Sequence, residues 1–93
     1  MKLEEHEKMT VLLLGEPFTG VHLWLDEFHE TLGAKHRRKR HHLKGIQEVR
    51  ALWGGRAADA AKQHIIDDLK LEGWKDGDHF PIDEADYVRM GLF

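Results

Sequence analysis

The stretch Ala34–Trp53, AKHRRKRHHLKGIQEVRALW, decides the fold prediction because it combines a helical apolar pattern with clustered basic residues and histidines. At helical spacing four apolar residues fall on one stripe, namely Leu43, Ile46, Val49 and Trp53. His42 lies within this stripe and His41 lies at its edge. A buried imidazole without a hydrogen-bond partner costs about 1–3 kcal/mol. These histidines therefore need partners inside the fold.

The sequence on both sides of this stretch also predicts helices, with glycine and proline marking their ends. We expect helices over residues 2–14, about 20–32, the basic segment to about 53, 56–71 and 81–90. The helix over 56–71 has the clearest buried stripe, which consists of Ala57, Ala58, Ala61, Ile65 and Leu69. The run Val11–Leu14 also fits a short buried strand, because periodicity does not separate the two for so short a run. The predicted fold is all-α, a compact four-helix bundle plus a short C-terminal helix in one domain, 1–93.

Composition narrows the class of protein. Hydrophobic residues make up 41% and charged residues 33% of the chain, which fits a small globular domain. The longest apolar run is too short for a membrane span and the first residues are acidic, so we expect a cytoplasmic protein without a membrane partner. The chain contains neither cysteine nor serine. Disulfides, thiolate metal ligands and serine or cysteine nucleophiles are therefore excluded.

Histidine is the unusual component, with eight residues that do not form a single run. The pattern His22-x3-Asp26 recurs as His64-x3-Asp68. On a helix the members of such a pair lie on one face, with Cβ atoms roughly 5–6 Å apart. If the helices pack together, we expect both pairs to converge with His42 on one divalent metal ion, Zn, Mn, Fe or Ni.

The remaining histidines divide into two groups. His36 is a sixth proposed ligand, and His6 is a further candidate because it falls within the apolar stripe of the first helix. His29, His41 and His79 are expected at the surface or at the rim of the site. The alternative is a purely structural cluster, since a hydrogen-bonded His–Asp pair is a common way to satisfy a polar core.

The basic segment offers a separate binding hypothesis. Residues 34–44 contain six Lys and Arg and no acid, whereas the segments on either side are net acidic. Arg37 and Arg38 are candidates for binding an anionic small molecule or an acidic protein, and internal salt bridges fit equally well. Nucleic acid is a weaker candidate, because the charge is spread around the helix and the pI is near 6.2.

Three motifs taken in order carry a resemblance: HLWLD at 22–26, HRRKRHHLKGI at 36–46 and QHIIDDL at 63–69. With them the chain resembles a family of short bacterial and phage-encoded proteins that is classed as a domain of unknown function. The resemblance implies no particular activity. It marks the positions that match the family's motifs, which are His22, Trp24, Asp26, His36, Arg37, His42, Gln63, His64 and Asp68. The segment between the third and fourth helices is shorter here than in that family.

There is also a loose likeness to metal-dependent HD phosphohydrolases, which are helical proteins with several His and Asp ligands. The adjacent His-Asp dipeptide of those enzymes is missing here.

The functional hypothesis is a small cytoplasmic protein whose His/Asp cluster binds a divalent metal ion. If the protein is an enzyme, a metal-bound water with His or Asp as general base would support hydrolysis. The alternative is a non-enzymatic interaction module whose basic helix binds an acidic protein or nucleic acid. We also expect a homodimer, because the aromatic residues and aliphatics such as Leu12 and Leu23 exceed what so small a core can bury.

Overall fold

The computed structural model describes residues 1–91, and within this range the chain forms helices and turns without a strand. The elements are α1 (Leu3–Leu14), α2 (Thr19–Leu25), α3 (His29–Leu32), the 3-10 helix η1 (Gly33–His36), α4 (Arg37–Arg40), α5 (Leu43–Trp53), α6 (Gly55–Leu71) and α7 (Glu84–Met90). The predicted all-α class is confirmed, and Val11–Leu14 is helical. None of the helices within residues 1–91 combines the length and apolar character that a bilayer crossing requires.

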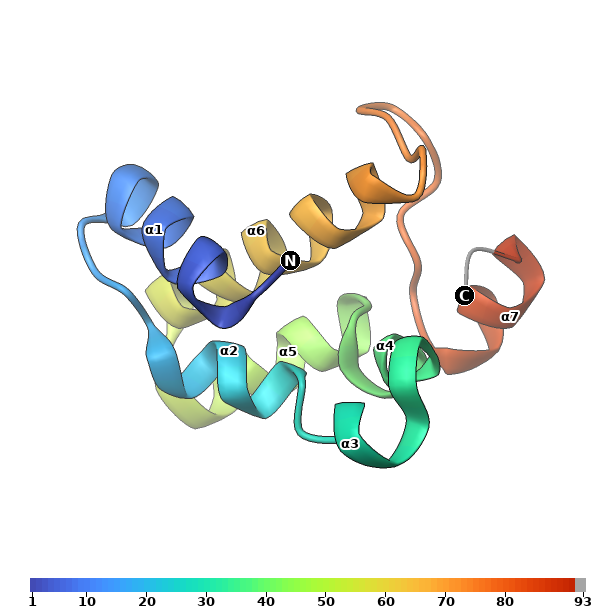
Figure 1. Cartoon of the computed structure of the whole chain (residues 1–93), viewed down its shortest axis with the longest axis horizontal. Coiled ribbons are helices and arrows are strands. Elements are labelled where there is room, and N and C mark those ends of the chain that lie inside the picture. Colours follow the sequence, from blue (N-terminus) through green and yellow to red (C-terminus); the bar gives the residue numbers. More distant parts are fainter. Residues whose placement is uncertain (92–93) are drawn as a thin grey trace.

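Helix α6 is the centre of the fold, because α1, α2 and α5 all pack against it (Figure 1). All five residues of its predicted apolar stripe are buried. Its alanines let neighbouring backbones approach closely, and Ile65 and Leu69 fill the space between the helices. Full burial of such aliphatic side chains contributes about 1.5–3 kcal/mol each. The core around α6 also includes Val21, Leu25, Ile46, Val49 and Tyr87.

The predicted helix over residues 20–32 is interrupted. Helix α2 ends at Leu25, and Asp26 follows it with φ −101° and ψ 9°, before α3 begins at His29. The interruption turns the Asp26 carboxylate toward His36 and His41, which lie farther along the chain. A continuous helix was therefore the wrong prediction for this segment, since long-range contacts decide its path.

The predicted helix over the basic segment is also interrupted, at His41 and His42. Helix α5 begins only at Leu43, whose backbone N–H donates to the Pro81 carbonyl, while the N–H of Lys44 donates to the Ile82 carbonyl. These two carbonyls come from the segment that precedes α7. Backbone groups distant in sequence therefore satisfy the first N–H groups of α5, which a helix leaves unpaired.

Candidate metal centre

Six of the eight histidines are buried in the interior, together with Asp68. They come from segments far apart in the sequence: His6 lies on α1, His22 on α2, His36 at the end of η1, His41 and His42 between α4 and α5, and His64 on α6. So many buried imidazoles require partners, because desolvation without hydrogen bonds is costly. Two carboxylates, Asp26 and Asp68, supply most of these contacts.

One carboxylate oxygen of Asp26 contacts three imidazoles. Its Oδ1 lies 2.8 Å from His36 Nε2, 3.2 Å from His41 Nε2 and 3.3 Å from His64 Nε2. The His41 Nε2 atom also lies 3.2 Å from the Leu25 carbonyl oxygen. Asp26 keeps 30% of its side-chain surface exposed. It therefore forms the solvent-facing side of the cluster.

Asp68 is the second carboxylate that contacts several imidazoles, and it is almost fully buried, with 2% of its side chain exposed. Its Oδ1 lies 3.3 Å from His6 Nε2, and its Oδ2 lies 3.4 Å from both His41 Nδ1 and His64 Nε2. The guanidinium of Arg37 approaches the same Oδ2 at 3.4 Å. The Arg37 charge therefore points into the cluster.

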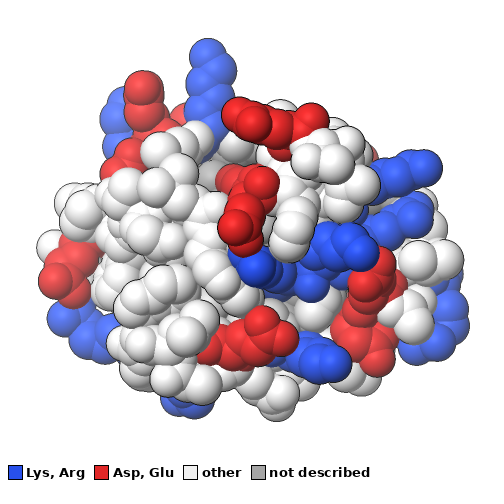
Figure 2. Space-filling view, turned by 90° about the horizontal axis from the view of Figure 1, so that it is seen from below, with Lys and Arg blue, Asp and Glu red and all other residues white. Residues whose placement is uncertain are grey.

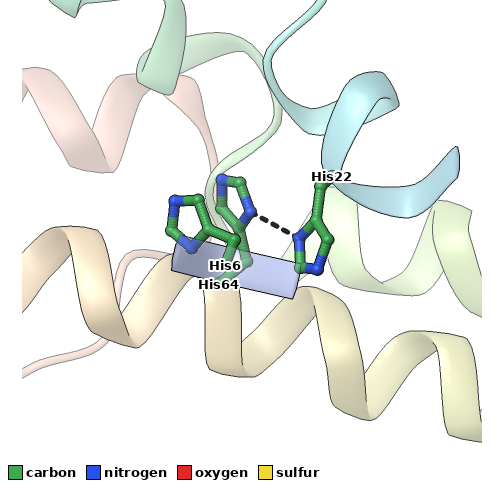
Figure 3. A group of neighbouring side chains, drawn as sticks. All are labelled: His6, His22 and His64. Atoms are coloured by element: carbon green, nitrogen blue, oxygen red, sulfur yellow. Dashed lines mark hydrogen bonds between the residues drawn. The ribbon is translucent and has the colours of Figure 1, made fainter. Parts of the chain in front are cut away.

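Three histidines, His6, His22 and His64, pack together (Figure 3). The rings of His6 and His64 stack with centroids 3.6 Å apart. The Nδ1 atoms of His22 and His64 are 2.8 Å apart and share a hydrogen bond. His64 therefore presents Nδ1 to His22 and Nε2 to the two carboxylates.

Within residues 1–91, two groups of side chains have ligand atoms close enough to hold a metal ion. One is Asp26, His41, His64 and Asp68, and the other is His6, His22 and His64; in each group the ligand atoms lie within 4.8 Å of one another. The first group mixes two imidazoles with two carboxylates, a donor set that suits Zn, Mn or Fe.

The electrostatics match a cluster that keeps its carboxylates charged. Burial alone would raise the pKa of Asp26, but hydrogen bonds from His36, His41 and His64 outweigh it and hold that pKa well below its usual range. Contacts with His6 and His64 likewise depress the pKa of Asp68 against the effect of burial. Both carboxylates are therefore ionised, as metal ligands must be.

The histidines are shifted in both directions. Burial, followed by the neighbouring His64 and His6, lowers the pKa of His22 to about 4. Burial also lowers the pKa of His41 to about 4, against the opposing influence of Asp26. For His64, contacts with Asp26 and Asp68 outweigh burial and raise its pKa. His22 and His41 are therefore neutral at pH 7, which leaves each ring with one nitrogen lone pair.

A pocket of about 660 Å³ opens onto the cluster. Among the residues that line it are Asp26, Asp68, His22, His36 and Arg37. An ion held by the carboxylates would therefore be within reach of a small molecule entering from solvent.

The structure brings together most of the proposed ligands but not all. His22, Asp26, His64 and Asp68 converge as predicted, and His36 contacts Asp26. His42 does not join them. Its Nδ1 accepts a hydrogen bond from the Gly45 N–H, and its Nε2 lies 3.0 Å from the Lys39 carbonyl oxygen, so it caps the start of α5.

His41 is the residue that the sequence analysis misplaced. We expected it at the rim, but it has no exposed surface and contacts both carboxylates. The two histidines exchange roles because the helix is interrupted between α4 and α5. His6, a further candidate in the sequence, is buried and contacts Asp68.

Replacing His42 by alanine is expected to lower the free energy of unfolding by about 1–2 kcal/mol, because α5 loses its cap. Metal stoichiometry should stay unchanged, since His42 lies outside both ligand groups. Urea unfolding followed by circular dichroism measures the first effect, and elemental analysis measures the second. A loss of bound metal without a loss of stability would return His42 to the site.

The metal-free protein is expected to lose stability as the pH falls from 6.5 to 4. In this range His22 and His41 bind protons in the unfolded chain, where the pKa is about 6.5, before they bind them in the folded protein. The unfolded state therefore gains protons first, and its free energy falls relative to the folded state. Below pH 4 the depressed pKa values of Asp26 and Asp68 add a further loss.

His64 affects stability in the opposite sense. Because its pKa is raised on folding, its contribution to the free energy of unfolding is complete below pH 6.5 and declines only at higher pH. It therefore does not offset the acid loss. Urea unfolding at pH 7, 6, 5 and 4 measures the profile. The variant His79→Ala, which removes a histidine with 57% of its side chain exposed, should keep the same profile; a flat wild-type profile would contradict the assignment.

The fold and the geometry thus define a small helical protein with a buried His/Asp cluster that could hold a metal ion. Comparison with protein-family models, with curated proteins and with solved structures found no match for this chain. The likeness to a family of unknown function therefore stays a prediction.

Proposed function

We propose that this protein is a small cytoplasmic metal-binding protein that holds one divalent ion, Zn, Mn, Fe or Ni, between Asp26, His41, His64 and Asp68. The observation that carries the proposal is the convergence of two imidazoles and two depressed-pKa carboxylates within 4.8 Å. His36 is proposed to orient Asp26 from outside, through its 2.8 Å hydrogen bond to Oδ1. Such outer contacts fix the direction of a ligand and raise its affinity for the metal.

Unsatisfied atoms in the cluster favour a metal site over a purely structural one. His41 Nδ1, His64 Nε2 and Asp68 Oδ1 are buried and lack a hydrogen bond of good geometry, although they lie within 3.5 Å of oppositely charged groups. Buried polar atoms are nearly always hydrogen-bonded in folded proteins. His41 Nδ1 and His64 Nε2 both lie 3.4 Å from Asp68 Oδ2, and a cation between them and that oxygen would satisfy both nitrogens.

The pocket beside the cluster supports a catalytic role. A metal ion facing this pocket would polarise a substrate or activate a bound water for hydrolysis. Arg37 lines the pocket and contacts Asp68. We therefore propose a small anionic substrate, with Arg37 as the charge nearest to the ion and Arg38 as a second candidate.

The experiment is elemental analysis by mass spectrometry on tag-free protein purified without chelators. We expect about one equivalent of a divalent metal per chain, and its loss in Asp26→Asn, chosen because Asp26 is the partly exposed ligand, and in His64→Ala. His79→Ala is the matched control, since the His79 side chain pairs with Asp86, which lies outside the cluster. If the wild-type protein holds no metal, even after incubation and desalting, the proposal is wrong and the cluster is structural. A positive result justifies a screen for hydrolase activity.

An interaction module is the second candidate function. Figure 2 shows basic side chains intermixed with acidic ones on one face of the molecule. Lys39 pairs with Glu84 and Arg40 pairs with Glu27. This pairing argues against nucleic acid as the partner, because part of the positive charge is already neutralised. Exposed aliphatics, Leu12 at 78% and Leu23 at 55%, supply apolar surface for a second copy.

A further inference from the structure

We propose that Thr10 and His22 are positioning residues that hold His64 in the one neutral tautomer able to bind the metal through Nε2. This inference rests on the proposed metal site and assigns His22, a predicted ligand, a different role. It follows from a chain of hydrogen bonds that runs from α1 through α2 to α6.

The first link is Thr10, which is buried on α1. Its hydroxyl oxygen lies 2.8 Å from the Pro17 carbonyl oxygen, 3.1 Å from that of Glu7 and 3.2 Å from that of His6. All three of these partners are acceptors only. The hydroxyl has a single proton, and its shortest contact is with the Pro17 carbonyl, so we assign the proton to that bond and leave the hydroxyl lone pairs to accept.

The second link is His22. Its Nε2 lies 3.2 Å from the Thr10 hydroxyl oxygen. Because that oxygen already donates its proton to a carbonyl, Nε2 of His22 must carry the hydrogen and donate. A neutral imidazole with its hydrogen on Nε2 has a lone pair on Nδ1. The Nδ1 of His22 is therefore an acceptor.

The third link is His64, whose Nδ1 lies 2.8 Å from Nδ1 of His22 (Figure 3). An acceptor on His22 requires a donor on His64, so Nδ1 of His64 carries a hydrogen. In the neutral ring the lone pair then lies on Nε2, which is the atom 3.3 Å from Asp26 Oδ1 and 3.4 Å from Asp68 Oδ2. When His64 is neutral, its Nε2 lone pair faces two carboxylate oxygens, and a proton or a metal ion at this point would bind all three atoms.

The hydrogen bonds that link Thr10, His22 and His64 also distinguish the two groups of candidate ligands. His22 uses both ring nitrogens in hydrogen bonds, to Thr10 and to His64. The trio of His6, His22 and His64 would have to break the second of these bonds to bind an ion. The group with Asp26 and Asp68 keeps it, and an imidazole ligand whose other nitrogen donates to a fixed acceptor is the usual arrangement in metal sites.

The test combines NMR with metal affinity. Long-range ¹H–¹⁵N spectra of ¹⁵N-labelled metal-free protein should show His22 with its hydrogen on Nε2 and an unprotonated Nδ1. The zinc-loaded protein should show His64 with its hydrogen on Nδ1. A hydrogen on Nδ1 of His22 in the neutral ring would overturn the inference.

The affinity arm uses Thr10→Val, which has nearly the shape of threonine but cannot accept from His22. We expect its zinc affinity, measured by competition with a chromophoric chelator, to fall about ten- to hundredfold, while saturating zinc still gives one equivalent. Thr10→Ser should restore the affinity, because it keeps the hydroxyl. Thr31→Val, the same change at an exposed position of α3, should have no effect.

The outcomes separate this inference from the proposed function. If wild-type protein binds no zinc, the metal site is wrong, and the tautomer of His22 still decides whether the hydrogen-bond chain exists. If wild-type protein binds zinc and Thr10→Val binds it equally tightly, the positioning role is wrong and the metal site stands.

Discussion

Replacing Gly45 by alanine is expected to destabilise the protein by about 3 kcal/mol, at the upper end of the usual cost of overpacking. Alanine is normally the better residue in a helix interior, by about 1 kcal/mol. Here a methyl group would overlap the Arg40 carbonyl, with the carbonyl carbon only 2.8 Å from the added Cβ. The neighbour is backbone, so it cannot rotate away. The clash would also disturb the turn that places His41 and His42.

The matched control is Gly20→Ala. Gly20 is exposed within α2, and a Cβ there would meet no atom within 4 Å. The same substitution should therefore be neutral or stabilising by up to about 1 kcal/mol. Urea unfolding of both variants gives the comparison. Equal effects at the two positions would show that the α5 backbone does not lie against Arg40.

Replacing Asp68 by alanine is expected to cost about 3–5 kcal/mol, the range for removing one partner of a buried ion pair. Asp68 is the counter-charge for Arg37 and contacts three imidazoles, those of His6, His41 and His64. Without it Arg37 loses an ion pair, and the three buried imidazoles lose a carboxylate that they contact. Urea unfolding of metal-free protein measures the stability, and Asp68→Asn, which keeps the shape of the side chain, should lose metal with less damage to the fold.

Asp67→Ala is the control, one position away on the same helix. Asp67 accepts a hydrogen bond from Gln63 within α6. Losing one such bond should cost about 1 kcal/mol or less, and bound metal should not change. If the two variants were destabilised equally, the role of Asp68 as the counter-charge of the cluster would be refuted.

Local patterns predicted the helices well and their continuity poorly. The apolar stripe on α6 could be predicted because five small or aliphatic residues repeat at helical spacing. Each of these residues is buried in the structure. The interruption after Leu25 has no glycine or proline to mark it. The interruption at His42 has an imidazole as the N-cap instead of the usual Ser, Thr, Asp or Asn. Contacts with distant segments produce both.

For the candidate site, too, the sequence predicted the local features and missed a residue whose position depends on the tertiary structure. The i, i+4 repeat identified His22, Asp26, His64 and Asp68, because each pair is local to one stretch of chain. His41 was missed for a geometric reason. In a continuous helix successive side chains diverge by about 100°, so a single helix over this segment would fix His42 within the apolar stripe and His41 at its edge. The non-helical backbone at His41, φ −83° and ψ 53°, removes that restriction.

The sequence by itself determined the all-α class, the central helix and the four His and Asp residues around which the cluster forms, because helical periodicity is a local property of the chain. Only the tertiary structure decided that His41 enters the cluster, that His42 caps α5 and that Thr10 contacts His22. These assignments depend on backbone carbonyls, such as those of Pro81 and Pro17, that approach from segments distant in sequence. Hydrogen bonds to such groups leave no periodic signal in the chain.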